Sequence, residues 1–460
     1  MALSLVKLEE FILEKMSETG LPGISGAAVE GEEVIWSKGF GFRDLEHGLA
    51  ATPHTLYGIG SVTKSFTALA VMQLAEQGKL DPEDPVEAHL PFAIRVEGEP
   101  VRVWHLLTHS SGIPALGYAE SLIRGIIGAG EHWLPIASYS DLFTFMEGAS
   151  EWAVAKPGER WFYLNEGYVL LGYIIEHRSD LSYQEYVRKH ILEPLGMERS
   201  FFSREEVESD QDAATPYVIT REKERKPSTY PYGAISSDGG LISNVLDLAK
   251  YISMYLSWGK LDGVRLVSRE SLEAMETPRV RTPLQEGPFG ELGYAYGLHV
   301  VPDFLGYKLI GHSGSVLVAT AYMGFIPERG VGIVLLANGS GYPLSQLGMY
   351  GLVILLGEDP EGLPFVFRER ALSELEGTYE TYKGTMKAQV KRNGDFLTLE
   401  IRDKYNDLIV PLVPEKLEED IRTFYTLEAG YKLPVEFRAQ EGQIDLLFER
   451  YRLRKTGKLP

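Results

Sequence analysis

The chain has 460 residues and a formal net charge of −20 at pH 7, from 45 Lys and Arg against 65 Asp and Glu. This acid excess argues against a surface that follows nucleic-acid phosphates or anionic membranes. The absence of cysteine excludes disulfides, thiolate metal sites and cysteine nucleophiles. We therefore expect a globular protein of two or three domains without a nucleic-acid or membrane partner, a metal or another cofactor.

The N-terminal segment lacks the pattern of a secretion signal. Its apolar residues are interrupted by Lys7, Glu9 and Glu10 before an apolar core reaches useful length. The longest uncharged stretch, residues 331–357, is broken near Asn338 and Pro343 into runs too short to span a bilayer. We expect a cytoplasmic protein in which this stretch forms a buried strand and a buried helix.

The predicted elements of the first 356 residues begin and end with sheet-forming segments. Apolar residues at helical spacing predict an N-terminal helix that ends at Gly20. A hairpin of strands at 24–29 and 34–39 follows, and helical patterns dominate from Ser61 to about residue 285. Strands return at 296–301, 308–310, 316–326 and 331–337, and a helix covers about 345–356. The pattern predicts one sheet built from both ends of this segment, with helices inserted between them.

A second domain is expected at the C-terminus. Residues 357–373 are rich in Gly, Pro and Glu, which indicates a linker between a domain at 1–356 and a domain at 374–460. Beyond it the pattern predicts about eight short strands, and Asn393-Gly394 is typical of a hairpin turn. Eight strands in under ninety residues favour a small antiparallel barrel.

Ser61-Val-Thr-Lys64 has the Ser-x-x-Lys form. One helical turn places the Lys64 amine beside the Ser61 hydroxyl, where it can accept or relay a proton. Ser4 and Ser257 begin the same pattern by chance, but only Ser61 follows a Gly-Ile-Gly corner that can expose a hydroxyl at a helix N-terminus. The alternative for Ser61 is a simple helix cap.

Two further motifs follow along the chain. In Tyr163-Leu-Asn165, the phenol can share a proton with a lysine, and the amide of Asn165 can hold both the lysine and a substrate carbonyl. In His312-Ser-Gly314, entering the predicted strand at 316–326, the glycine permits close approach of a substrate to a sheet edge.

Two other candidates have structural explanations. His105 and His109 have the i, i+4 spacing of metal ligands, but Leu106 occupies the position where a metalloprotease helix carries Glu. A structural role for the two histidines is therefore favoured. Asp238 is expected to cap a helix or to pack, and orientation of a substrate is its alternative role.

Together, the motifs Ser-x-x-Lys, Tyr-x-Asn and His-x-Gly resemble those of the penicillin-recognising serine hydrolases, nearest the class C β-lactamase and D-aminopeptidase branch. The resemblance covers about residues 15–355 and is reinforced by the segments 105–113 and 239–243. It implies an α+β fold, in which a β-lactamase-like antiparallel sheet is flanked by helices with an inserted helical region. Leu164 and His312 depart from the family pattern, which has Ser and Lys at these places. His312 in place of this Lys fits aminopeptidases and esterases better than it fits β-lactamases or carboxypeptidases.

The appended barrel narrows the resemblance to self-compartmentalising serine peptidases of archaeal type, which carry a lipocalin-like C-terminal domain. This resemblance implies small peptides as substrates, including peptides with D-amino acids, and a closed homo-oligomer that could be an octamer. It also implies roles for the site residues. Ser61 is the nucleophile, Lys64 and Tyr163 manage its proton, and Asn165 positions the acyl amide. The oxyanion lies between the backbone N–H groups of Ser61 and Ser315, beside Gly314, and His312 faces the leaving group.

Several questions stay open at this point. Either Lys64 or Tyr163 can be the base, because a half-neutral lysine at pH 7 needs a pKa lowered by about 3.4 units from its usual value. A carboxylesterase acting on small acyl esters uses the same acylation machinery. A catalytically inactive binding or sensor module on this fold is the alternative from another class.

Overall fold

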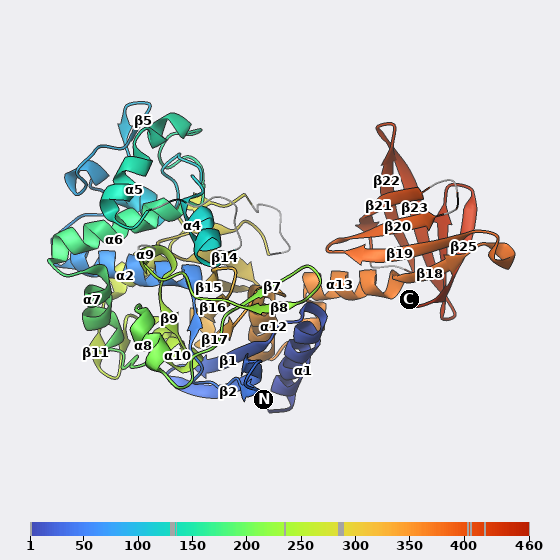
Figure 1. Cartoon of the computed structure of the whole chain (residues 1–460), viewed down its shortest axis with the longest axis horizontal. Coiled ribbons are helices and arrows are strands. Elements are labelled where there is room, and N and C mark those ends of the chain that lie inside the picture. Colours follow the sequence, from blue (N-terminus) through green and yellow to red (C-terminus); the bar gives the residue numbers. More distant parts are fainter. Residues whose placement is uncertain are drawn as a thin grey trace. The chain divides into compact units, whose positions relative to one another are not determined.

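The computed structural model describes residues 2–128, 134, 136–233, 236–283, 289–402, 404, 407–417 and 420–459. The chain divides into two compact units, Met1–Glu358 and Asp359–Pro460. The first unit combines a large sheet with helices, and the second contains a closed barrel (Figure 1).

A nine-stranded antiparallel sheet forms the centre of the first unit, in the order β12-β13-β14-β15-β16-β17-β1-β2-β3. Its strands are β1 (Gly23–Glu30), β2 (Glu33–Asp44), β3 (Leu49–Ala50), β12 (Val280–Arg281), β13 (Gly293–Tyr294), β14 (His299–Phe304), β15 (Tyr307–Ser315), β16 (Thr320–Ile326) and β17 (Val331–Ala337). β1 pairs with β17, from Ile24 opposite Ala337 to Glu30 opposite Val331. The prediction of one sheet built from both ends of the segment is confirmed.

Helices cover both faces of this sheet. Successive side chains of β17 point to opposite faces. A Cβ on Gly332 would lie 2.4 Å from Ile252 of α10 (Val245–Leu256), whereas the neighbouring Ile333 contacts Gly351 of α12 (Leu344–Leu355). Therefore α10 and α12 pack on opposite faces. The N-terminal helix α1 (Ala2–Thr19) packs against α12 (Figure 1).

The remaining elements of the first unit lie between β3 and β12 in the sequence. The helices are α2 (Thr63–Glu76), α3 (Val103–Leu107), α4 (Tyr118–Ile126), α5 (Tyr139–Met146), α6 (Asn165–Ser179), α7 (Tyr183–Val187), α8 (Arg204–Ser209), α9 (Ser236–Gly239) and α11 (Arg269–Glu276). The short strands are β4 (Tyr57–Gly58), β5 (Arg95–Val96), β6 (Glu99–Pro100), β7 (Tyr217–Ile219), β8 (Arg225–Pro227), β9 (Ile242–Ser243), β10 (Lys260–Leu261) and β11 (Val264–Arg265).

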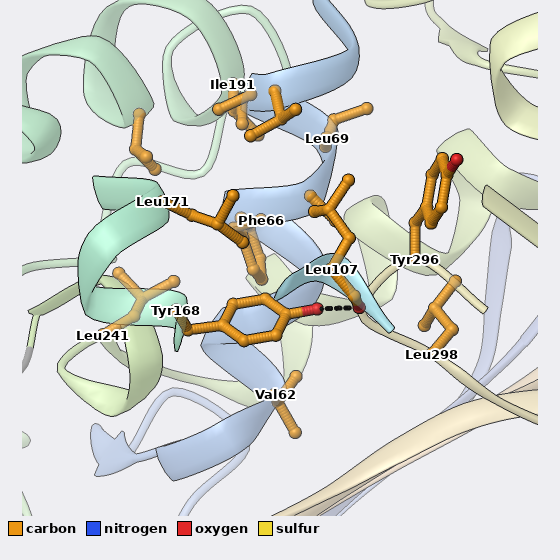
Figure 2. Packing of buried hydrophobic residues seen from close by; sticks show 14 of the residues in the cluster. Val62, Phe66, Leu69, Leu107, Tyr168, Leu171, Ile191, Leu241, Tyr296 and Leu298 are labelled. Carbon is orange, nitrogen blue, oxygen red and sulfur yellow. Dashed lines mark hydrogen bonds between the residues drawn. The ribbon is translucent and has the colours of Figure 1, made fainter. Parts of the chain in front are cut away.

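Helix α2 is the centre of this helical region. Its residues are buried from Thr63 to Leu74, so the helix is buried on all sides rather than on one face. It packs against α6 and α9. Figure 2 shows Phe66 of α2 beside Leu171 and Tyr168 of α6, and the Tyr168 hydroxyl donates to the carbonyl of Leu107 at 2.6 Å. This packing holds α2 rigidly, with its first turn facing the sheet.

The structure corrects one strand boundary that affects the third motif. The sequence predicts a strand at 316–326 with His312-Ser-Gly314 leading into it. Instead, β15 runs through this motif to Ser315, and β16 begins at Thr320. The backbone reverses direction between them, and Leu317 has a positive φ of 66°. The motif therefore lies on a strand of the sheet, next to the turn that joins it to β16.

The uncharged stretch at 331–357 forms β17 and α12, both of them buried, as predicted. No helix within the described residues combines the length and apolar character needed to cross a membrane.

The second unit contains a closed eight-stranded barrel, which confirms the predicted C-terminal barrel. Its strands are β18 (Gly377–Glu380), β19 (Lys387–Asn393), β20 (Phe396–Arg402), β21 (Asp407–Lys416), β22 (Ile421–Glu428), β23 (Tyr431–Gln440), β24 (Gln443–Phe448) and β25 (Tyr451–Gly457). Alternate residues such as Leu397, Leu399, Phe424 and Phe437 are buried and form its core. The β19–β20 turn consists of residues 394–395, one position later than predicted, because Asn393 pairs with Phe396.

The segment 357–373, predicted as a linker, contains a regular helix. After a short 3-10 turn at Pro360–Gly362, helix α13 occupies Pro364–Leu375. Leu372 and Leu375 of this helix belong to the hydrophobic core of the barrel. Pro360 and Pro364 therefore stand at helix starts, and residues 359–373 are part of the second unit.

Candidate active site

Ser61 lies at the corner between β4 and α2. Gly58 ends β4, Gly60 has a positive φ of 50°, and residues Gly60–Val62 form a 3-10 turn, η1, that continues into α2. Only glycine adopts this φ readily, so the Gly-Ile-Gly corner produces the sharp turn that the sequence indicates. Ser61 is partly exposed and lines a cavity of about 150 Å³. The hydroxyl is thus presented to a cavity at the start of a helix.

Lys64 follows one turn later and is completely buried. Its Nζ lies 3.0 Å from Ser61 Oγ, 2.8 Å from Asn165 Oδ1 and 2.6 Å from the backbone oxygen of Asp238. The amide oxygen and the carbonyl oxygen accept two N–H bonds in either charge state of the amine. The remaining position on the amine nitrogen therefore faces Ser61 Oγ. It carries an N–H when Lys64 is charged and a lone pair when Lys64 is neutral.

Two tyrosine rings border the amine of Lys64. Its Nζ stands 4.9 Å from the ring centre of Tyr163 and 5.4 Å from that of Tyr168. Aromatic faces attract a cation. The rings therefore stabilise the ammonium form of Lys64.

His109 supports Tyr163 through hydrogen bonds to the residues on either side of it. Its carbonyl accepts the backbone N–H of Phe162 at 2.7 Å, and its Nδ1 accepts the backbone N–H of Leu164 at 2.9 Å. The ring centres of His109 and Tyr163 are 4.1 Å apart. Burial, aided by the charge of Lys64, lowers the pKa of His109 well below its usual range. The neutral ring can thus keep Nδ1 as an acceptor, which agrees with a structural role for this histidine.

The end of β15 packs directly onto the turn that carries Ser61. A Cβ on Gly314 would lie 1.9 Å from the oxygen of Ile59 and 3.1 Å from the nitrogen of Ser61. A Cβ on Gly60 would likewise lie 2.6 Å from the nitrogen of Ser315. Two glycines that face each other thus bring the backbone nitrogens of Ser61 and Ser315 to one side of the cavity. Paired N–H groups of this kind can stabilise an oxyanion.

We expect Gly314→Ala to reduce kcat by about 100-fold, the scale of losing one oxyanion donor. The added methyl group cannot stand 1.9 Å from the oxygen of Ile59, so β15 must move away from Ser61. Steady-state kinetics on a small ester would measure the effect, and thermal unfolding would show whether the fold persists. Gly362→Ala is the control, because no atom lies within 4 Å of its Cβ position. Full activity in Gly314→Ala would contradict this role of the strand.

His312 lies near Tyr163 and does not line the Ser61 cavity. Its side chain is buried, Nδ1 donates to the carbonyl of Ser313 at 2.5 Å, and Nε2 accepts from the Tyr294 hydroxyl at 2.9 Å. Burial lowers the pKa of His312 well below its usual range, in agreement with this neutral form. Both ring nitrogens are occupied within the protein. Contact between His312 and a leaving group stays a prediction.

Two buried carboxyl groups lie near Lys64. Burial raises the pKa of Asp238 to about 7, although the charge of Lys64 opposes this shift. Burial also raises the pKa of Glu166, whose Oε1 accepts the backbone N–H of Tyr118 at 3.0 Å. Asp238 contributes to the site through its backbone oxygen and also lines the cavity beside Ser61. Asp238 lies within the short helix α9 and its side chain is buried, which agrees with the expected packing role.

Ser61 of the first motif, Asn165 of the second and Ser315, which follows the third, thus line one cavity. Besides Ser61 and Asp238, the cavity is lined by Ala119, Glu120, Ile123, Arg124, Asn165, Gly239, Ser315, Val316 and Leu317. Two family models match the chain. The model described as Beta-lactamase matches residues 8–356, and the model described as Pab87 octamerisation domain matches residues 360–454.

The chain belongs to the β-lactamase family. The first unit of this β-lactamase family member has the fold of penicillin-binding-like serine hydrolases. A solved structure described as the octameric penicillin-binding protein homologue from Pyrococcus abyssi is 52% identical. It covers 98% of this chain and 100% of its own, with a TM-score of 0.93. A D-stereospecific amidohydrolase from Streptomyces sp. shares the fold, with 24% identity, a TM-score of 0.60 and coverage of 74% of this chain and 96% of its own.

Among curated relatives, the putative penicillin-binding protein PbpX of Bacillus subtilis (strain 168) is 30% identical over 299 residues. The match covers 64% of this chain and 70% of PbpX. Protein flp of Staphylococcus aureus (strain MW2) is 28% identical over 356 residues, which cover 72% of this β-lactamase family member. The chain spans only 62% of the length of protein flp.

Sequence reasoning missed several parts of this site. The backbone oxygen of Asp238 carries no sequence signal, because every residue has one. The support of Tyr163 by His109 was also missed. The sequence favours a structural role for His109, but nothing in the segment 105–113 indicates that this role is the support of Tyr163. Glu120 and Arg124, four residues apart on α4, give no sign in the sequence that they line the cavity.

Proposed function

We propose that this protein is a serine peptidase or amidohydrolase that acts through an acyl-enzyme on small peptides, among them peptides with D-amino acids. The observation that carries the proposal is the position of Lys64 Nζ. Two fixed acceptors orient it, and its remaining direction points at Ser61 Oγ 3.0 Å away. This is the arrangement of a nucleophile with its base. The preference for D-amino acids comes from the motif resemblance described above.

Acylation follows from these contacts. Ser61 Oγ bonds to the substrate carbonyl carbon as its proton passes to Lys64, and the N–H groups of Ser61 and Ser315 stabilise the oxyanion. The carbon–nitrogen bond then breaks, and the leaving amine takes a proton delivered from the Lys64–Tyr163 pair. Asn165 Oδ1 accepts from Lys64, so its NH₂ group faces away from the amine and can donate to the acyl amide. Water then attacks the ester and returns a proton to Ser61.

The experiment that tests the proposal is hydrolysis of matched L- and D-aminoacyl amides and short-chain esters, with the intact mass of the protein read for an acyl group. Turnover of D-amides with an acyl adduct on Ser61 would support the peptidase. Turnover of esters alone would favour the carboxylesterase alternative. No turnover and no adduct would favour a binding or sensor module.

We further propose that the chain forms a homo-oligomer, an octamer by analogy with the Pyrococcus abyssi homologue and the matched octamerisation-domain model. The barrel also carries exposed apolar side chains that self-association would bury, among them Leu408, Ile409, Ile421, Leu427 and Tyr431. Light scattering after size exclusion should therefore give a mass of about eight times that of the chain. A monomeric mass at micromolar concentration would contradict the assembly.

A further inference from the structure

A second cavity lies among α4, α5, α6, α7 and α9, separate from the cavity at Ser61. Its volume is about 480 Å³, within the size range of small-molecule binding sites. Among the described residues, the two cavities share no lining residue. The side chains that matter most for its chemistry are Tyr118, Tyr139, Leu142, Val169, Glu176 and Tyr183, and we call it the tyrosine cavity.

Glu176 lies between two of the three tyrosines. Its Oε1 accepts the Tyr139 hydroxyl at 3.2 Å and the backbone N–H of Tyr183 at 3.0 Å. The Tyr183 hydroxyl is bonded to Thr67 Oγ1 at 2.8 Å, so this ring is held in place as well. The carboxylate is thus fixed beside two aromatic residues. Aromatic rings and a carboxylate both attract an organic ammonium.

The charge around the tyrosine cavity is negative. None of its described lining residues is Lys, Arg or His. Two carboxylates besides Glu176 bond to its lining. Asp141 accepts the backbone N–H of Ser138 at 3.0 Å, and Glu185 accepts that of Ser182 at 3.0 Å. Within the part of the chain that the structure describes, none of these three carboxylates forms an ion pair.

The arginines nearest to these acids along the chain are engaged elsewhere. Arg178, which follows Glu176 on α6, donates to His89 Nδ1 at 2.7 Å and to the carbonyl of Ala88 at 2.8 Å. Arg188, directly after α7, pairs with Glu206 at 2.5 Å. The carboxylates of the tyrosine cavity are therefore not neutralised by these two cations.

Tyr118 supplies a further polar group. It is completely buried, and its hydroxyl has no hydrogen-bond partner among the described residues. A buried polar group without a partner is costly. The phenolic oxygen can accept an N–H bond. A ligand that carries N–H donors can therefore satisfy this hydroxyl and gain affinity from it.

We infer that the tyrosine cavity binds a small organic cation, with a primary ammonium at Glu176 and an apolar body against Leu142 and Val169. The three N–H donors of an ammonium suit the Glu176 carboxylate and the phenolic oxygen of Tyr118. A carboxylate on the same ligand would be repelled by the acids around the cavity. The site thus favours amines over zwitterionic amino acids. The inference does not depend on the proposed peptidase activity, because different residues line the two cavities.

The test is a ligand-observed NMR titration of the full chain at pH 7 with three ligands of similar size. 2-Phenylethylamine carries the ammonium, 2-phenylethanol is its neutral counterpart, and 3-phenylpropionate carries a carboxylate. We expect the Kd of the amine to be about tenfold lower than that of the alcohol, the scale of a charge pair combined with a cation–ring contact. The carboxylate should not bind. Equal affinity for the amine and the alcohol, or no binding of the amine, would overturn the inference.

Glu176→Gln should raise the Kd of 2-phenylethylamine by about fivefold to tenfold. The amide keeps an oxygen that can accept from Tyr139 and Tyr183, but it carries no charge. Glu205→Gln is the matched control, because it removes the same charge from the exposed surface of α8. The control should change the Kd by less than about twofold, since salt screens distant surface charges. Equal effects of the two variants would mean that the amine is attracted only by the net charge of the protein.

Two further variants decide where the amine binds. Tyr118→Phe removes only the unpartnered hydroxyl, so the protein should keep its Tm while the Kd of the amine rises about threefold. Glu120→Gln tests the competing site, since Glu120 lines the Ser61 cavity. If Glu120→Gln weakens binding and Tyr118→Phe does not, the amine is held at Ser61 and the inference is wrong. Should thermal unfolding show that Glu176→Gln is not folded, an unchanged Kd in Tyr118→Phe is enough to reject the site.

Discussion

Ser61→Ala is expected to lower kcat by at least about 10⁴-fold, because it removes the hydroxyl that Lys64 Nζ faces. Lys64 Nζ points at Ser61 Oγ, and the paired N–H groups face the same place, so without the hydroxyl the remaining groups have no nucleophile to activate. The measurement is steady-state hydrolysis of an ester or amide that the wild type accepts, together with the intact mass after brief exposure to substrate. The acyl adduct should disappear with the activity.

The chain offers a matched control for this prediction. Ser257 begins another Ser-x-x-Lys sequence, but its Oγ donates to Glu32 at 3.0 Å near the end of α10. Ser257→Ala should keep kcat within about twofold of the wild type, in line with ordinary surface substitutions. If Ser61→Ala keeps a tenth or more of the activity, Ser61 is not the nucleophile.

Lys64→Met is expected to lower kcat by about 10³-fold, within the range contributed by a positioned acid or base. Methionine fills a similar volume in the buried space but cannot take the Ser61 proton. The change also leaves Asn165 Oδ1 and the backbone oxygen of Asp238 without the donor that they share. Each stranded acceptor costs about 1–3 kcal/mol. Relief from burying a charge offsets part of this cost, so the variant should fold with a modestly lower Tm.

Kinetics and thermal unfolding together test this second prediction. Lys156→Met is the control, since Lys156 is exposed and pairs with Glu99 at the surface. The control should change neither kcat nor Tm appreciably. If Lys64→Met keeps more than a tenth of kcat while remaining folded, Tyr163 rather than Lys64 must accept the Ser61 proton.

Much of the architecture follows from local patterns in the sequence. Helical spacing of apolar residues predicts α1 and α12, and short alternating runs predict the strands of the barrel. Those patterns are reliable because each element must turn an apolar side toward a core, whatever it packs against. Local patterns failed at turns and segment boundaries. The start of β16 and the helix α13 depend on pairing and packing partners elsewhere in the chain.

The sequence by itself determined the pairing of Ser61 with Lys64. Two residues three positions apart lie side by side in any fold that forms that helix, and the glycine corner before them needs only local backbone geometry.

Only the tertiary structure decided what completes the site. The two acceptors that orient Lys64 lie 101 and 174 positions away in the sequence and reach it because α6 and α9 pack against α2. The ring of His312 is likewise directed by Tyr294, which lies on β13 of the same sheet. Such contacts are set by how whole elements pack, and a residue's near neighbours in sequence do not encode them.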